Sequence, residues 1–254
     1  MKIGDCVVRI SHNKDIIFRI YDIRKDIAIL AGIYVRLIAD AKLDDLEVID
    51  DEILSRAEDE EYSYYNNIVS SIKRDSREVN GKVLHLDSDV GYLRKCLQFY
   101  KDNNIYAYGV CYKEEQMADN INDLVLKIRP DVIVITGHDS YNRKGLDNLD
   151  NYSHTSDYIK TIKKVREQFS LDDIFIYAGA CGSNFEALIA SGANFASSVN
   201  RDNIDAYDPA IVAYIAATTR ITNLINLDKF KKLSKSANKV VGGIDSYGKM
   251  RVVI

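Results

Sequence analysis

The sequence predicts an α/β protein in which a small β-barrel domain precedes a larger domain built on a mostly parallel sheet. Residues 2–49 contain short apolar runs separated by polar turns, which is the spacing of a small barrel. From residue 81 onward, strand-like runs alternate with helix-like segments, the pattern of a parallel sheet covered by helices on both faces. We therefore predict a barrel domain at residues 1–50, a helical and basic linker at 51–80 and a sheet domain at 81–254.

Four strand-like runs account for the barrel domain. They span residues 6–10, 16–20, 27–31 and 33–38. The linker that follows begins with clustered acidic residues, which predicts a solvated helix, and it ends in an exposed basic segment that contains Lys73, Arg74 and Arg77. We hypothesise self-cleavage at these basic bonds; the alternative is that another protease cuts them, because an exposed segment is easily nicked.

The sheet domain is predicted to contain five strands with helices between them, followed by a closing strand pair. The strands are expected at residues 82–87, 105–112, 131–136, 174–178 and 194–197. The helices are expected at residues 92–101, 115–128, 158–169, 185–190, 209–219 and 227–237, and the closing pair at 240–254. The third strand is apolar throughout, so both of its faces are expected to be buried.

Composition limits the classes of partner and cellular location. A hydrophobic content of 46% is ample for a packed core, and a formal net charge of -4 gives no general attraction to nucleic acid or to an anionic membrane. The chain shows no signal peptide and no apolar run long enough to span a membrane, so we expect a cytoplasmic protein. Its four cysteines are widely spaced, which argues against a zinc knuckle or a disulfide framework.

Two predicted strands end in residues that can carry chemistry. The third strand leads into His138, and the fourth leads into Cys181. Because reactive groups gather at the carboxyl ends of strands in open α/β sheets, an imidazole and a thiol are expected side by side if these two strands are neighbours. His138 would accept the thiol proton and later return a proton to the leaving amine.

The residues around the thiol favour reactivity. Ser183 and Glu186 have the spacing of a capping box, which predicts a helix that starts just after Cys181 and directs its positive end at the sulfur. Gly182 allows a sharp turn, and we predict that backbone amides at Asp139 and Gly182 hold the oxyanion of a tetrahedral intermediate. The alternative is that Cys181 is a small core residue, which is the commoner role of a buried cysteine.

The chain resembles the YabG family of sporulation-specific peptidases over nearly its whole length. The matching segments are residues 4–9, 36–40, 81–87, 129–131, 136–139, 178–181, 183–187 and 191–198. The order of the histidine and cysteine also resembles the caspase-like clan of cysteine peptidases, although Asp139 stands where that clan usually has glycine.

The resemblance implies a caspase-like α/β sandwich and an SH3-like barrel. It also implies a cysteine endopeptidase that acts through a thioester acyl-enzyme, processes spore coat and cortex-related proteins, and cuts after arginine. No metal and no organic cofactor are implied, and the location would be the mother cell or forespore. An arginine pocket needs a half-buried carboxylate, and we predict Asp87 or Asp89, with Asp139 as a weaker candidate. The alternative for Asp87 and Asp89 is a turn or a helix cap.

Other functions stay open from the residues themselves. A related sheet could carry a cysteine amidase or glutaminase, or the chain could be a nonenzymatic scaffold of a coat assembly. The first domain resembles SH3-like modules and is expected to dock a peptide or coat protein, with RNA as the less favoured ligand. Cys6, Cys96 and Cys111 are interpreted as core residues, and His85 as a packing histidine.

Overall fold

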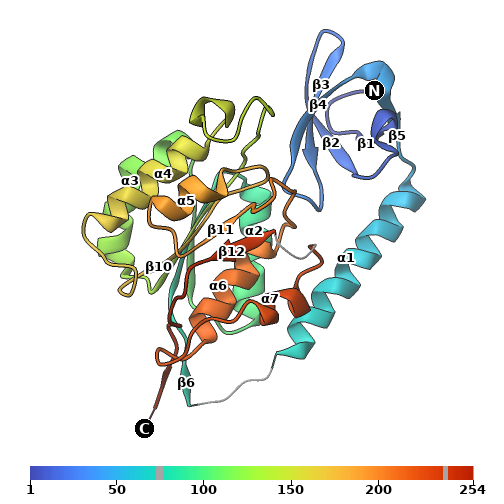
Figure 1. The fold of residues 1–254 in the computed structure, drawn as a ribbon. Helices are drawn as coiled ribbons and strands as arrows, with labels where there is room; N and C mark the ends of the chain where they lie inside the picture. Colours follow the sequence, from blue (N-terminus) through green and yellow to red (C-terminus); the bar gives the residue numbers. More distant parts are fainter. Residues whose placement is uncertain (73–76, 237–239, 254) are drawn as a thin grey trace. The chain divides into compact units, whose positions relative to one another are not determined.

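The computed structural model describes residues 1–72, 77–236 and 240–253 of the chain and shows a mixed α/β protein (Figure 1). The chain divides into two compact units, Met1–Ile72 and Lys73–Ile254. Within the described residues, every helix is too short or too polar to cross a membrane.

The first unit contains an antiparallel sheet of five strands. In chain order these are β1 (Cys6–Arg9), β2 (Phe18–Arg24), β3 (Ile27–Gly32), β4 (Ile38–Lys42) and β5 (Leu46–Val48), with short 3-10 turns at Ile10–His12 and Leu43–Asp45. The strand order is β4-β3-β2-β1-β5, and among the described residues no ladder joins β4 to β5. The run predicted as a strand at residues 33–38 differs in the structure. Its last residue, Ile38, begins β4, and the residues before it connect β3 to β4. Closure of the sheet into an SH3-like barrel stays a prediction.

Alternation along the strands gives the first unit its own core. In β2 the residues Phe18 and Ile20 are buried while Arg19 and Tyr21 are exposed, as expected when one face of a sheet packs inward. The core cluster consists of Val7, Phe18, Ile20, Ala28, Leu30, Ala41 and Leu46. Helix α1 (Asp51–Ser71) completes the unit, and Asp50 caps it by accepting a hydrogen bond from the backbone N–H of Ile53 at 2.8 Å.

Part of the predicted linker belongs to the second unit. Residues Glu78–Val79 form β6, which pairs antiparallel with β13 (Arg251–Val252). The bonds proposed for self-cleavage after Lys73 and Arg74 lie outside the described residues. The strand pair predicted at residues 240–254 is wrong in its pairing, because β12 (Val241–Gly243) pairs with β11 and β13 pairs with β6.

A six-stranded sheet organises the second unit. Its order is β12-β11-β10-β9-β7-β8, and all neighbours are parallel except β11 and β12. The strands not yet given are β7 (Val83–Asp87), β8 (Ala107–Cys111), β9 (Val132–Thr136), β10 (Phe175–Ala178) and β11 (Phe195–Ser197). The central strands β7, β9 and β10 are buried along their whole length, as predicted for a sheet covered on both faces.

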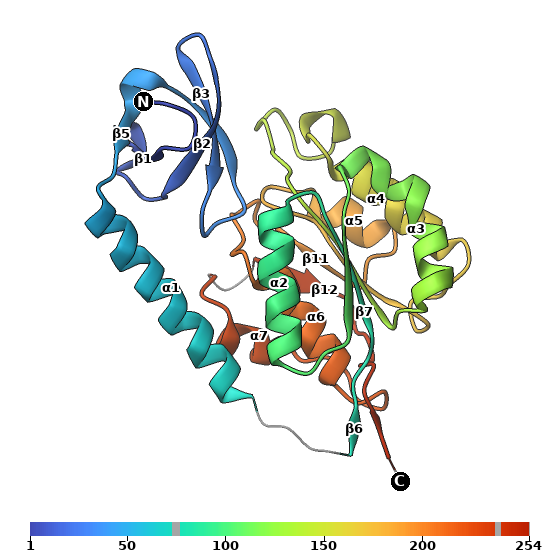
Figure 2. The same cartoon turned by 180° about the vertical axis from the view of Figure 1, so that it is seen from behind.

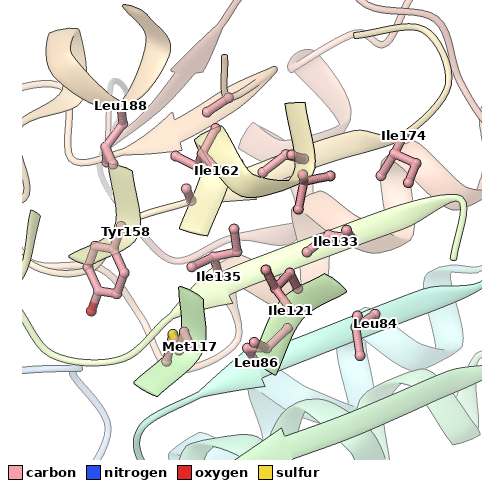
Figure 3. Packing of buried hydrophobic residues seen from close by; sticks show 14 of the residues in the cluster. Leu84, Leu86, Met117, Ile121, Ile133, Ile135, Tyr158, Ile162, Ile174 and Leu188 are labelled. Atoms are coloured by element: carbon pink, nitrogen blue, oxygen red, sulfur yellow. The ribbon is translucent and has the colours of Figure 1, made fainter. Parts of the chain in front are cut away.

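Helices cover both faces of this sheet (Figures 1 and 2). The helices α3 (Glu114–Ile128), α4 (Thr155–Arg166) and α5 (Phe185–Ala190) lie on one face. The helices α2 (Val90–Asp102), α6 (Asp208–Thr218) and α7 (Asp228–Leu233) lie on the other face, and a 3-10 turn at Leu149–Asn151 precedes α4. Figure 3 shows Ile133 and Ile135 of β9 packed against Ile121 of α3 and Ile162 of α4.

Candidate active site

The predicted histidine and cysteine follow adjacent strands. Strands β9 and β10 are parallel neighbours, with Ile135 in register with Ala178, so His138 and Cys181 each lie three residues beyond a matched pair. The hydroxyl of Thr136 donates to the carbonyl of Gly179 at 2.9 Å and ties the two strand ends together. The sheet therefore brings both segments to the carboxyl ends of its neighbouring strands β9 and β10, as the sequence predicted.

Asp139 connects the histidine segment to the cysteine segment. Its Oδ2 accepts hydrogen bonds from the hydroxyls of Ser183 at 2.8 Å and Thr155 at 2.5 Å. Its Oδ1 accepts from the backbone N–H groups of Ser140 at 2.9 Å and His154 at 2.8 Å. Burial raises the pKa of the Asp139 carboxyl above its ordinary value, although these hydrogen bonds lower it. This side chain thus holds the loops of the site in place.

The thiol of Cys181 is almost fully buried, with 2% of the residue exposed. The backbone N–H of Ile204 donates to its Sγ at 3.3 Å, so this residue covers the sulfur. On the inner side, Gly179 has a φ of +112°, and a Cβ there would lie 2.6 Å from the carbonyl oxygen of Ser197. Glycine is therefore required where β10 turns into the cysteine segment.

The capping box predicted at Ser183 is wrong. Helix α5 begins at Phe185, and its N-cap is Asn184, whose side chain accepts from the backbone N–H of Ala187 at 3.0 Å. The Ser183 hydroxyl is instead bonded to Asp139, and the Glu186 carboxylate pairs with Arg201. The helix is six residues long and starts after an intervening turn, so a helix dipole directed at the sulfur is not supported.

His138 lies between two carboxylates. Its Nε2 is 3.7 Å from Oδ2 of Asp89, and its Nδ1 is 3.9 Å from Oε1 of Glu114. The hydroxyl of Ser88 lies 3.2 Å from the same Nδ1 and donates to Glu114 at 2.5 Å. The backbone of His138 is also held, since its N–H donates to Glu114 at 2.8 Å and its carbonyl accepts from the Tyr158 hydroxyl at 2.8 Å.

The sequence motifs do not include Ser88 and Glu114. Ser88 directly follows β7, and Glu114 opens α3 shortly after β8 ends. The strand-end rule that found His138 and Cys181 would have found both residues if it had been applied to the first two strands of the sheet.

The two aspartates predicted for an arginine pocket have different surroundings. Asp87 is fully buried, accepts a hydrogen bond from the backbone N–H of Asp89 at 3.0 Å and lies 3.6 Å from Nε2 of His85. His85 is itself buried and bonded to the Tyr100 hydroxyl at 2.9 Å, so it packs in the core. Asp89 caps α2 through Oδ1, which accepts from two backbone N–H groups, and its side chain is 29% exposed.

The remaining cysteines differ from their predicted role at one position. Cys96 is buried and Cys6 is partly buried, but Cys111 is exposed because β8 is an edge strand of the sheet. Desolvation by partial burial raises the pKa of the Cys111 thiol, and the charges of Asp87, Asp89 and Glu114 raise it further. Among the described residues, Glu114, Glu115 and His154 bring possible metal ligands within 4.8 Å of one another.

Comparison with known proteins adds a family to this geometry. A family model described as YabG peptidase U57 matches residues 2–254. The sporulation-specific protease YabG of Bacillus subtilis (strain 168) is 37% identical to this chain over an aligned length of 280 residues. The alignment covers 99% of this chain and 97% of that protein.

Proposed function

Because the chain belongs to the YabG peptidase U57 family, it is a peptidase, and we propose that it is a cysteine endopeptidase that processes spore coat and cortex-related proteins during sporulation. The observation that supports the cysteine mechanism is that His138 and Cys181 each follow, by three residues, a member of the register pair Ile135 and Ala178 of β9 and β10. That placement is the one expected of a nucleophile and its base in an open α/β sheet.

The proposed reaction forms and then hydrolyses a thioester. His138 accepts the Cys181 proton, and the thiolate attacks the scissile carbonyl carbon. Backbone N–H groups at Asp139 and Gly182 stabilise the oxyanion, and His138 protonates the leaving amine. Water, deprotonated by His138, then attacks the thioester carbonyl carbon. The C–S bond breaks, which releases the acid product and regenerates Cys181. Because the Ile204 amide covers the sulfur, this segment has to move aside before a substrate can bind.

Preference for arginine would reside in Asp89 rather than Asp87. A substrate guanidinium needs a carboxylate that it can reach, and Asp89 is partly exposed beside His138 while Asp87 is fully buried beside His85. Asp139 is less suited, because its carboxylate is already held by four donors. For the first unit we propose docking of a coat-protein segment.

Cleavage of fluorogenic peptides tests the proposal. Peptides that end in Arg, Lys, Asp or Gln are incubated with the wild-type protein and with the Cys181→Ala, His138→Ala and Cys6→Ala variants. We expect cleavage after arginine by the wild type and by Cys6→Ala, since Cys6 lies in strand β1 of the first unit. Both other variants should lose at least about a hundredfold in rate, because each removes one member of the catalytic pair.

Two outcomes would contradict the proposal. Unchanged cleavage by Cys181→Ala would exclude this cysteine as the nucleophile. Release of ammonia from small amides, together with no cleavage of any peptide, would indicate an amidase instead.

A further inference from the structure

We propose that Ser88 and Glu114 form a hydrogen-bonded relay that positions His138 and fixes which of its nitrogens acts as the base, an inference that rests on the proposed cysteine mechanism. The relay runs from Nδ1 of His138 to the Ser88 hydroxyl at 3.2 Å and from that hydroxyl to Oε1 of Glu114 at 2.5 Å.

The direction of the hydrogen bonds determines the tautomer. An ionised carboxylate only accepts, so the single hydroxyl proton of Ser88 is given to Glu114. The Ser88 oxygen then faces the imidazole with a lone pair and accepts the Nδ1 proton of His138. Neutral His138 therefore carries its proton on Nδ1, and the unprotonated Nε2 is the nitrogen that takes the thiol proton. Once protonated, Nε2 lies 3.7 Å from the Asp89 carboxylate, which stabilises the imidazolium.

The Glu114 carboxylate is placed to hold His138. It is buried, and its Oε1 accepts from the backbone N–H of His138 as well as from Ser88. The N-cap of α3 is Lys113, whose side chain makes no capping hydrogen bond. A carboxylate at the first turn of a helix is also favoured by the helix dipole. One oxygen thus anchors the histidine through its backbone and, by way of Ser88, through its ring.

The approach of Ser88 and Glu114 depends on Gly137. A Cβ at this position would lie 2.3 Å from the Ser88 hydroxyl oxygen and 2.6 Å from Oε1 of Glu114. Both distances are shorter than any ordinary van der Waals contact, so a larger residue would push the relay away from His138. Gly137 is therefore needed for the space that its missing side chain leaves to Ser88 and Glu114.

The test measures kcat and KM for peptide cleavage by the full chain carrying Ser88→Ala or Glu114→Gln. We expect kcat to fall about a hundredfold with KM unchanged, since the relay acts on the base and not on the substrate. Controls are Ser191→Ala, whose hydroxyl donates to the Leu188 carbonyl of α5, and Glu167→Gln at the exposed end of α4. Both controls should keep wild-type kcat. Thermal unfolding identifies any variant that fails to fold, and Ser88→Ala then decides the question without Glu114→Gln.

The double variant separates a relay from two independent contributions. If Ser88 acts through Glu114, then Ser88→Ala/Glu114→Gln loses no more activity than the more damaging of the two single variants. Losses that multiply would overturn the relay.

Alkylation of Cys181 gives a readout that does not need turnover. The rate of modification by iodoacetamide is followed against pH on the Cys181 peptide by mass spectrometry, because Cys111 is exposed and reacts separately. Both relay variants should require a higher pH to reach the same rate, while the two controls should follow the wild type. If Cys181→Ala is inactive but both relay variants match wild type in kcat and in alkylation, the relay is rejected and the cysteine mechanism stands. If Cys181→Ala is active, the proposed function fails first.

Discussion

Asp139 shows how one side chain can hold the loops of a candidate site in place. Its two oxygens accept hydrogen bonds from the histidine segment, from the start of α4 and from the cysteine segment. The sequence offered this residue as a backbone oxyanion donor, as a weaker candidate for the arginine pocket and as a departure from the glycine of caspase-like enzymes. Its partners Thr155 and Ser183 are far along the chain, so the sequence could not show that the carboxylate bridges three loops.

Asp139→Ala should reduce the free energy of unfolding of the second unit by about 2–3 kcal/mol, because it leaves buried donors without an acceptor. Urea denaturation followed by circular dichroism measures the loss. Asp147→Ala, at an exposed position of the same loop, is the matched control and should stay within about 0.5 kcal/mol of the wild type. Equal losses in the two variants would show that the bridge contributes nothing.

The same carboxyl should give the stability a pH dependence of known sign. Burial raises the pKa of Asp139 in the folded state, so its stabilising contribution is complete below the ordinary pKa of an aspartate and is lost as pH rises through the folded-state pKa. The difference in unfolding free energy between the wild type and Asp139→Asn should therefore shrink from about pH 4 upward. A difference that grows with pH would contradict this assignment.

At the scale of the elements, Asp89 combines a helix cap with a charge beside the histidine. Asp89→Asn should keep the cap of α2 and the stability, because an asparagine oxygen caps a helix as well, whereas Asp89→Ala should cost about 1 kcal/mol. If Asp89 binds the substrate arginine, both variants should lose the preference for arginine over lysine in kcat/KM. Retention of the preference in Asp89→Asn would remove Asp89 from the pocket.

The sequence predicted elements well where their signal is local. The strands β9 and β10 follow from continuous apolar runs, and their polar ends located His138 and Cys181. The capping box failed because Ser183 bonds to Asp139 instead of to its own helix, so a long-range contact overrode a local pattern. The exposure of Cys111 was missed because a strand's own residues do not say whether it lies at the edge of a sheet.

At the scale of the whole molecule, the two units have separate cores. Leu30→Ala in the first unit and Ile133→Ala in the second should each cost about 2–5 kcal/mol, since both side chains are fully buried. Hydrogen exchange should locate the first loss within residues 1–72 and the second within 77–253. Equal loss of protection in both units from either variant would show that they unfold as one.

The strand order is the part of the fold that the sequence leaves open. Alternating strands and helices predict a parallel sheet, but they do not place β7 between β8 and β9 or an antiparallel strand beside β11. These choices depend on how the helices pack, and the register they produce is what brings Ser88 and Glu114 to His138.

The pairing of β6 with β13 has a consequence for how the protein is made. The ribosome delivers Glu78–Val79 early, yet their partner Arg251–Val252 and the strand β12 that covers β11 come much later. All the residues assigned to the candidate site are synthesised before either of these two pairings can form. We therefore expect the second unit to complete its folding only after translation has passed β13.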